Sequence, residues 1–220
     1  MQSVALRHTG DLTVIDAKAL QQELAAKVER QDRLGDVRHV AGIDVAYCSE
    51  GMQKAAAAVF SFPALELVET ATIKAEVRFP YIPGLLSFHE MDAALAALRR
   101  LRIRPDLLLC DGHGLAHPRR FGLACHLGVL ADMPAIGVAK SHLIGTPADP
   151  APERGRWTPL IDAGDIIGAV LRTRTAVRPV YVSIGHRVSL ETAVGFVLAC
   201  TRRFRLPETT RAADGLSRSS

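Results

Sequence analysis

Apolar residues along the chain follow a helical spacing first and then form short runs typical of buried strands. Leu20 and Leu24 recur at helical spacing, and Asp16 stands where it can cap the helix. The pattern therefore predicts a helix over residues 16–33.

The short apolar runs that follow are separated by polar residues, glycine or proline. The first three predict strands that form an antiparallel meander. Later strands alternate with helices, which predicts a mixed sheet with helices on its faces. The predicted elements, in chain order, are strands over 37–47, 54–62 and 65–77, a helix over 88–101, a strand over 106–110, a helix over 119–130, a strand over 135–139, a hairpin over 157–161 and 165–172, a strand over 180–183 and a helix over 189–204.

This order of elements matches an α/β fold, the ribonuclease H-like mixed sheet, in which three antiparallel strands precede parallel strands and helices flank the sheet. With 220 residues, 48% of them apolar, the chain can bury a sizeable core. One domain over 1–220 is expected. The tail over about 206–220 is only weakly specified by the pattern.

Two of the predicted strands carry an aspartate in an apolar setting. Asp44 interrupts the run 40–47, and Asp111 follows the run 106–110. Burying a lone carboxylate costs several kcal/mol unless a cation or hydrogen-bond donors compensate it. The two aspartates therefore indicate a divalent metal site. The ribonuclease H-like fold carries its metal carboxylates on the first strand, the first long helix and the fourth strand.

Glu90 is a third acidic residue near the start of a predicted helix, and it has two interpretations. Residues 87–90 are Ser-Phe-His-Glu, a capping box in which Glu90 would close the helix N-terminus. Alternatively, a carboxylate on the first turn could reach a metal ion or its water. The two aspartates keep the second interpretation open.

The residues of two loops and one strand end also suggest contact with a ligand. In the loop 79–84, two prolines stiffen the chain around Tyr81, and a rigid apolar tip can enter a base stack. Loop composition alone favours the alternative, in which Tyr81 packs on the core. Lys140 ends an apolar strand, where its ammonium can face a phosphate or simply solvent.

The loop after Asp111 is rich in glycine. It resembles a dinucleotide fingerprint only weakly, because His117 stands where the third glycine would be. The glycines favour close approach of backbone to a ligand, with Arg119 and Arg120 near phosphates at a helix N-terminus. No nucleophile elbow or Cys/His pairing accompanies them.

Charge is distributed unevenly along the chain. The whole chain carries +4, whereas residues from 172 onward contain nine Arg, no Lys and three acidic residues, which gives 9 − 3 = +6. This asymmetry suits a polyanion such as nucleic acid, and equally a solvated basic face.

The four cysteines form no CxxC pair, which indicates a reducing compartment and no structural zinc. The first ten residues have no signal-peptide core, and no run reaches about 18 apolar residues. A cytoplasmic protein without membrane contact is expected.

Together these motifs resemble the endonuclease V family, the deoxyinosine 3′ endonucleases also called deoxyribonuclease V. The resemblance implies a DNA repair endonuclease that hydrolyses the second phosphodiester bond 3′ to deoxyinosine, whose base is hypoxanthine. Such an enzyme would leave 3′-hydroxyl and 5′-phosphate ends, use Mg²⁺ and tolerate Mn²⁺. The implied partner is damaged DNA, and a monomer is expected. The motifs that carry the resemblance lie at 40–47, 78–90, 111–122, 137–140, 182–186 and 205–208.

The resemblance also implies roles for individual residues. Asp44 and Asp111 would be magnesium ligands, with Glu90 as the third acidic residue. Lys140 would lie near the scissile phosphate, and Asp214 would be catalytic at a position where family members carry His or Asp. Tyr81 would belong to a strand-separating wedge. The implied substrate contacts are Tyr81, Pro83, Gly84, Leu86, Gly112, His117 and Leu123.

Two alternatives to this function stay open. One is a related ribonuclease H-like nuclease that prefers inosine in RNA. The other is a non-catalytic nucleic-acid-binding module. The acidic set argues against the module, since carboxylates without a metal would repel the phosphates it must hold.

Overall fold

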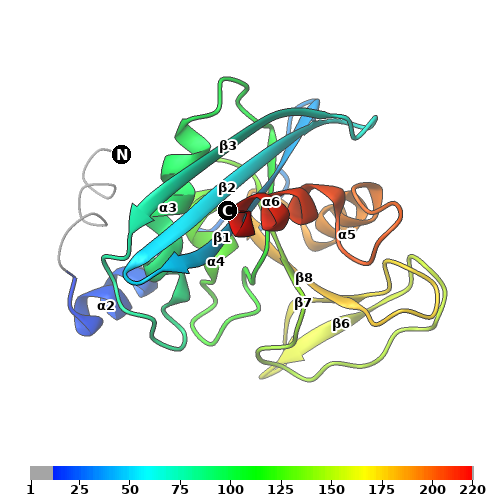
Figure 1. Cartoon of the computed structure of the whole chain (residues 1–220). Coiled ribbons are helices and arrows are strands. Elements are labelled where there is room, and N and C mark those ends of the chain that lie inside the picture. Colours follow the sequence, from blue (N-terminus) through cyan, green and yellow to red (C-terminus); the bar gives the residue numbers. More distant parts are fainter. Residues whose placement is uncertain (1–11, 220) are drawn as a thin grey trace.

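The computed structural model describes residues 12–219 and contains one eight-stranded sheet with helices on both faces (Figure 1). The predicted absence of a signal peptide concerns residues that lie outside this range. The elements, in chain order, are α2 (Val14–Ala25), β1 (His39–Ser49), β2 (Met52–Ser61), β3 (Leu67–Glu76), α3 (Leu86–Arg99), β4 (Leu107–Cys110), α4 (Leu123–Ala131), β5 (Ala135–Ala139), β6 (Trp157–Asp162), β7 (Asp165–Leu171), β8 (Val180–His186), α5 (Leu190–Ala199) and α6 (Glu208–Arg218).

The strand order is β3-β2-β1-β4-β5-β8-β7-β6. The predicted antiparallel meander β1-β2-β3 and the parallel strands β1-β4-β5 are both present. Beyond β5 the sheet is antiparallel again, because β8 pairs antiparallel with β5 and the β6–β7 hairpin extends from β8. Parallel pairing is therefore confined to the centre of the sheet.

Successive residues of β1 face opposite sides of the sheet. Ala41 and Ile43 lie in the core formed with α3 and α4, whereas Val40 lies in the core formed with α5 and α6. Gly42 is so close to α6 that a Cβ there would lie 2.0 Å from the carbonyl oxygen of Thr209. By the same alternation, Asp44 faces α6.

Small side chains let helices pack on both faces of β2. Residues 55–58 are four consecutive alanines with no exposed surface. Ala57 packs in the core under α3, and Ala58 packs in the core that includes α6. Figure 1 shows α6 in front of the sheet and α3 behind it.

The helix bounds differ from the prediction: α3 is shifted by two residues toward the N-terminus, and α5 ends at residue 199 rather than 204. The differences in α2 and α4 are also large. The N-cap of α2 is Thr13, which forms a capping box with Asp16, and this helix ends at residue 25 rather than 33. The helix predicted from residue 119 begins at Leu123, because the chain before it turns to contact other loops. Within residues 12–219, no helix is long and apolar enough to cross a bilayer.

The weakly specified tail forms a well-packed helix, α6, from residue 208 to 218. Its buried residues are small or polar, so its sequence carries little apolar pattern; they are Thr209, Thr210, Ala213 and Ser217. This face contacts β1, β2 and β4. The docking of α6 therefore depends on close backbone approach rather than on large apolar side chains.

We expect Gly42→Ala to lower the free energy of unfolding by about 1–3 kcal/mol, because overpacking would force α6 away from β1. Urea unfolding followed by circular dichroism measures the change. Gly35→Ala is the matched control, since nothing lies within 4 Å of a Cβ at that position. Equal stability of the two variants would contradict the close α6–β1 contact.

Candidate active site

Two aspartates lie side by side where the parallel pairing of β1 with β4 ends. In the β1–β4 pairing Ile43 lies opposite Cys110, and the amide of Asp111 donates a hydrogen bond to the Ile43 carbonyl at 3.2 Å. Asp44 directly follows Ile43, and Asp111 directly follows Cys110. Asp44 is 8% exposed, and the Asp111 side chain is 13% exposed. Two nearly buried carboxylates are thus placed together.

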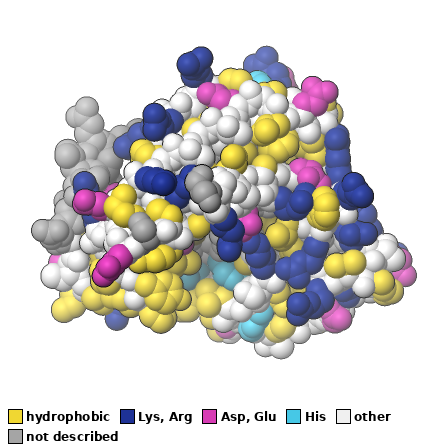
Figure 2. Space-filling view, in the orientation of Figure 1, with side chains coloured by type: hydrophobic (Ala, Val, Ile, Leu, Met, Phe, Trp, Pro, Cys, Tyr) yellow, Lys and Arg dark blue, Asp and Glu magenta, His cyan; other side chains and the backbone are white. Residues whose placement is uncertain are grey.

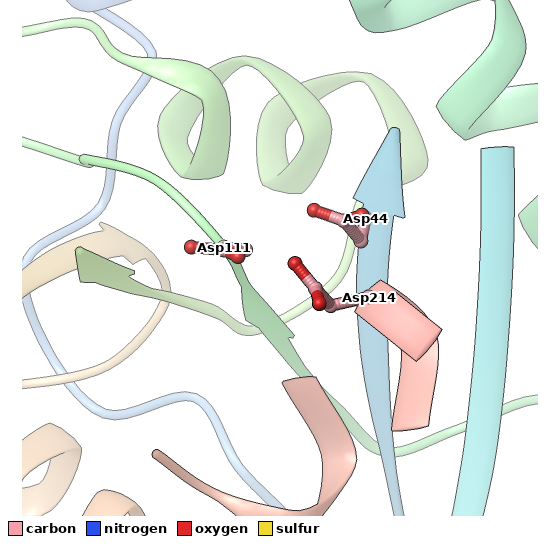
Figure 3. Close-up of side chains that lie close together, drawn as sticks. All are labelled: Asp44, Asp111 and Asp214. Carbon is pink, nitrogen blue, oxygen red and sulfur yellow. The ribbon is translucent and has the colours of Figure 1, made fainter. Parts of the chain in front are cut away.

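A third carboxylate comes from α6. One carboxylate oxygen each from Asp44, Asp111 and Asp214 lies within 4.8 Å of the other two (Figure 3). Figure 3 shows that the three side chains converge from β1, from the end of β4 and from α6. We call these three residues the carboxylate cluster. The docking of α6 on β1 is what brings Asp214 into it.

Lys140, directly after β5, pairs with two members of the cluster. Its Nζ lies 2.5 Å from Asp111 Oδ2 and 3.0 Å from Asp214 Oδ1. The third member, Asp44, accepts a hydrogen bond at 2.5 Å from the hydroxyl of Ser217. The interpretation in which Lys140 merely reaches solvent is therefore wrong, since its ammonium balances negative charge.

The charges of the cluster alter the pKa of its members. Burial raises the pKa of Asp44, and the neighbouring charges of Asp111 and Asp214 act in the same direction. For Lys140, burial opposes the charged form, but the hydrogen bonds to Asp111 and Asp214 prevail and raise its pKa. Burial also opposes ionisation of Asp214, yet Lys140 lowers the pKa of that carboxyl. The cluster is therefore strongly anionic and already attracts one cation.

The donor set fits a divalent metal ion. Carboxylate oxygens are the ligands that Mg²⁺ and similar hard cations prefer. Three of them converge here from separate elements, and the ammonium of Lys140 occupies the position of a compensating cation between two of them. Asp44, Asp111 and Asp214 are thus the residues that could hold a metal ion.

Glu90 does not cap α3. The N-cap position is Leu85, which makes no side-chain capping hydrogen bond. The hydroxyl of Ser87, expected to cap the helix, instead contacts Nδ1 of the buried His126 at 3.0 Å. The capping-box interpretation is therefore wrong.

Glu90 is instead influenced by the carboxylate cluster. Burial, followed by the charges of Asp44 and Asp111, raises the pKa of Glu90 to about 8. Its carboxyl group lies near the cluster without belonging to the group of oxygens within 4.8 Å. At neutral pH most Glu90 side chains hold a proton in the metal-free protein.

A pocket of about 240 Å³ adjoins the cluster, because Gly112 follows Asp111 directly. All of the predicted substrate-contacting residues line it, together with residues that the resemblance did not imply, among them His113, Ser141 and His142. The predicted members are Tyr81, Pro83, Gly84, Leu86, Gly112, His117 and Leu123.

One wall of this pocket is held by Gln21 and Arg119. Gln21 has no exposed surface and donates to the Gly84 carbonyl at 3.2 Å. The Arg119 guanidinium donates to Gln21 Oε1, and to the same Gly84 carbonyl at 2.5 Å. Arg120 pairs with Asp162 at 2.7 Å. Both arginines are thus engaged within the protein, which differs from the expectation that they face phosphates.

Two histidines give the pocket neutral polar walls. Burial lowers the pKa of both His113 and His117 to about 4. The ring nitrogen Nδ1 of His117 accepts a hydrogen bond from the amide of Arg119 at 3.2 Å. With uncharged imidazoles at neutral pH, the pocket suits an uncharged polar ligand.

Tyr81 projects from the edge of the same pocket. Its side chain is 66% exposed, and its ring makes an edge contact with His89 at a centroid distance of 6.2 Å. The buried Phe79 anchors the loop two residues earlier. The interpretation in which Tyr81 packs on the core is therefore wrong.

Comparison with known proteins identifies the family. A sequence model of endonuclease V matches residues 22–215, which is most of the chain. The chain belongs to the endonuclease V family. It is therefore an endonuclease, a hydrolase. Endonuclease V of Roseiflexus sp. (strain RS-1) is 56% identical over 205 residues, covering 93% of this chain and 92% of that protein.

Solved structures of endonuclease V have the same fold. The crystal structure from Streptomyces avermitilis has a TM-score of 0.90 and 47% identity, covering 94% of this chain and 92% of that one. The Ciona intestinalis enzyme, in complex with a 24mer DNA containing an inosine followed by a ribo-adenosine, has a TM-score of 0.82 and 31% identity, covering 93% and 96%. The predicted ribonuclease H-like fold is thereby confirmed.

In the metal-free endonuclease, we expect Glu90→Gln to reduce the decline of stability with rising pH and to leave the smaller part that comes from the raised pKa of Asp44. The pKa of Glu90 in the folded protein is about 8, against an ordinary value of 4.5. Its contribution to stability is therefore fully present below pH 4.5 and is lost as the pH rises through about 8. Glutamine stays neutral and removes this loss.

Thermal unfolding in EDTA across this pH range measures the effect. Glu191→Gln, at an exposed glutamate in the first turn of α5, is the matched control. The same pH profile for Glu90→Gln and wild type would show that Glu90 is not buried beside the cluster.

Proposed function

We propose that this endonuclease cleaves DNA at deoxyinosine, at the second phosphodiester bond 3′ to the lesion, with Mg²⁺ as cofactor and Mn²⁺ as a substitute. The adjacency of two sites carries this proposal: the neutral pocket and the carboxylate cluster are joined through the peptide between Asp111 and Gly112. A base held in the pocket leaves the phosphates that follow it free to extend toward the cluster. The inosine-containing DNA bound by the Ciona relative supports this substrate.

The pocket has the size and polarity for one base. Its volume of about 240 Å³ suits a single flipped nucleobase rather than a longer ligand. Leu86 and Leu123 provide apolar contact, while backbone groups around Gly84 and Gly112 can donate and accept hydrogen bonds. Hypoxanthine is uncharged, which matches the neutral histidine walls.

Tyr81 and Pro83 would form the wedge that compensates for the flipped base. The Tyr81 ring is exposed and lies on the pocket rim, so it can enter the stack from which the base leaves. The Gln21–Arg119 contacts hold the loop in place before DNA binds. A preorganised wedge lowers the entropic cost of binding.

Hydrolysis joins a water oxygen to phosphorus and breaks the bond between phosphorus and the 3′ oxygen, which leaves with a proton as a 3′-hydroxyl. A magnesium ion held by Asp44, Asp111 and Asp214 would neutralise phosphate charge and activate water. Lys140 provides a positive charge for the phosphate at the same place. Glu90 lies close enough to Asp44 and Asp111 for their charges to raise its pKa, so its carboxyl group would be in reach of water at the bound ion.

The surface around the cluster supports binding of a polyanion. Arg205 donates to the carbonyl of Lys140 at 3.2 Å, and Arg211 lies 3.5 Å above the ring of the exposed Phe204. Figure 2 shows Lys and Arg side chains gathered on this face over α6 and the region beside it. Such a surface attracts phosphates, and its affinity for nucleic acid falls as the salt concentration rises.

We expect labelled duplexes with a single deoxyinosine to be nicked at the second bond 3′ to it with Mg²⁺ and not in EDTA. Asp44→Ala and Asp111→Ala should each reduce the rate to below about 1% of wild type, because each removes a metal ligand. Gel electrophoresis of end-labelled strands measures the rate and the position. Asp165→Ala, at the exposed first residue of β7, is the control.

Two further substrates complete this assay. An undamaged duplex should stay intact, and a strand with ribonucleotides after inosine tests the RNA alternative. Nicking in EDTA, or wild-type rates in either aspartate variant, would contradict the proposed metal site.

For the wedge, we expect Tyr81→Ala to weaken binding to an inosine-containing duplex by about tenfold or more, and to weaken single-strand binding less. Only the duplex loses base stacking when the base flips, at a cost of a few kcal/mol per step. Fluorescence anisotropy in EDTA measures both affinities. Tyr81→Phe keeps the ring and should bind like wild type; equal losses on both substrates would point away from a wedge.

A further inference from the structure

We propose that Ser217 is a positioning residue for the metal site, whose hydroxyl holds one oxygen of Asp44 so that the other is presented to the metal ion. This inference rests on the metal-dependent function proposed above. It adds a residue that lies outside the carboxylate cluster and acts on one of its members.

The geometry of Ser217 is specific. Its Oγ lies 2.5 Å from Asp44 Oδ2, and its side chain is 1% exposed. Ser217 stands three residues after Asp214, so the two lie on the same face of α6. The Ser217 Oγ is also 3.0 Å from the carbonyl oxygen of Asp214, which places the hydroxyl over its own helical turn. Water has little access to this hydrogen bond.

The hydrogen bond restricts the rotation of the Asp44 carboxylate. A carboxylate that has one oxygen engaged by a donor offers its other oxygen as a ligand, in a fixed direction. Ligating carboxylates are commonly held by such partners, and loss of a partner typically weakens metal affinity by about 10–100-fold. Ser217 meets this description, because its donor is aimed at an aspartate that is itself nearly buried.

One helix thereby contributes twice to the site. α6 supplies the ligand Asp214 directly, and through Ser217 it orients Asp44 on β1. A structural role alone would require only that Ser217 fill its space in the α6–β1 contact. Metal affinity separates the two roles, because it depends on the hydroxyl and not on the volume.

The test is Mn²⁺ binding to the 220-residue chain without DNA. Electron paramagnetic resonance measures the Mn²⁺ that stays free. Ser217→Ala should weaken binding by about tenfold or more, and Ser217→Thr, which keeps a hydroxyl, should restore most of it. Ser219→Ala is the matched control, since the Ser219 hydroxyl on the same helix end donates to the Leu216 carbonyl and not to the cluster. Thermal unfolding in EDTA verifies that each variant is folded.

If Ser217→Ala does not fold, Ser217→Cys replaces it, because a thiol of similar size is a weak donor and should also bind Mn²⁺ less tightly. Unchanged Mn²⁺ affinity in a folded variant without the hydroxyl overturns the role of Ser217 and leaves the proposed function intact. Failure of the wild type to bind Mn²⁺, or binding that Asp111→Ala does not affect, overturns the metal-dependent function itself.

Discussion

The close contact between α6 and β1 is the constraint on which the active site depends. It is possible because Gly42 has no side chain and because the neighbouring strand β2 presents alanines to the helix. At this distance α6 places Asp214 beside Asp44 and Asp111, and Ser217 against Asp44. A larger residue at position 42 would separate Asp214 from the other two carboxylates of the cluster.

The protein only partly compensates the negative charge of the carboxylate cluster. Three carboxylates with oxygens within 4.8 Å of one another repel, and burial makes the repulsion stronger. Lys140 offsets part of it, and burial together with the remaining negative charge raises the pKa of Asp44 and of Glu90. Such perturbed groups are typical of functional sites, where a bound cation or substrate relieves the repulsion.

The pocket proposed for recognition and the cluster proposed for chemistry occupy adjacent but separate places in this endonuclease. The pocket is built from the loop around Gly84 and the residues after Asp111, and it is fixed by contacts from α2 through Gln21. The cluster is built from β1, the end of β4 and α6. Because the two places share the chain at Asp111 and Gly112, their spacing is set by covalent geometry. This arrangement is consistent with a cut displaced from the recognised base.

The sequence by itself determined the strand positions, the order of elements and the two aspartates in or directly after apolar runs, because alternation and apolar runs are local properties. It also indicated the pocket-lining residues through the family resemblance. Alternation along β1 even places Asp44 on the same face as Gly42, toward whatever helix covers that side.

Only the tertiary structure decided which groups join these residues. The buried face of α6 consists of Thr, Ala and Ser. The apolar pattern of the sequence therefore did not predict the helix that carries Asp214 and Ser217. The local capping motif at Glu90 does not form, because the Ser87 hydroxyl contacts His126, 39 residues away, instead of the start of α3. The Arg119 guanidinium donates a hydrogen bond to the carbonyl of Gly84, 35 residues away. Contacts over such separations depend on how elements pack, and the local pattern of residues does not encode that packing.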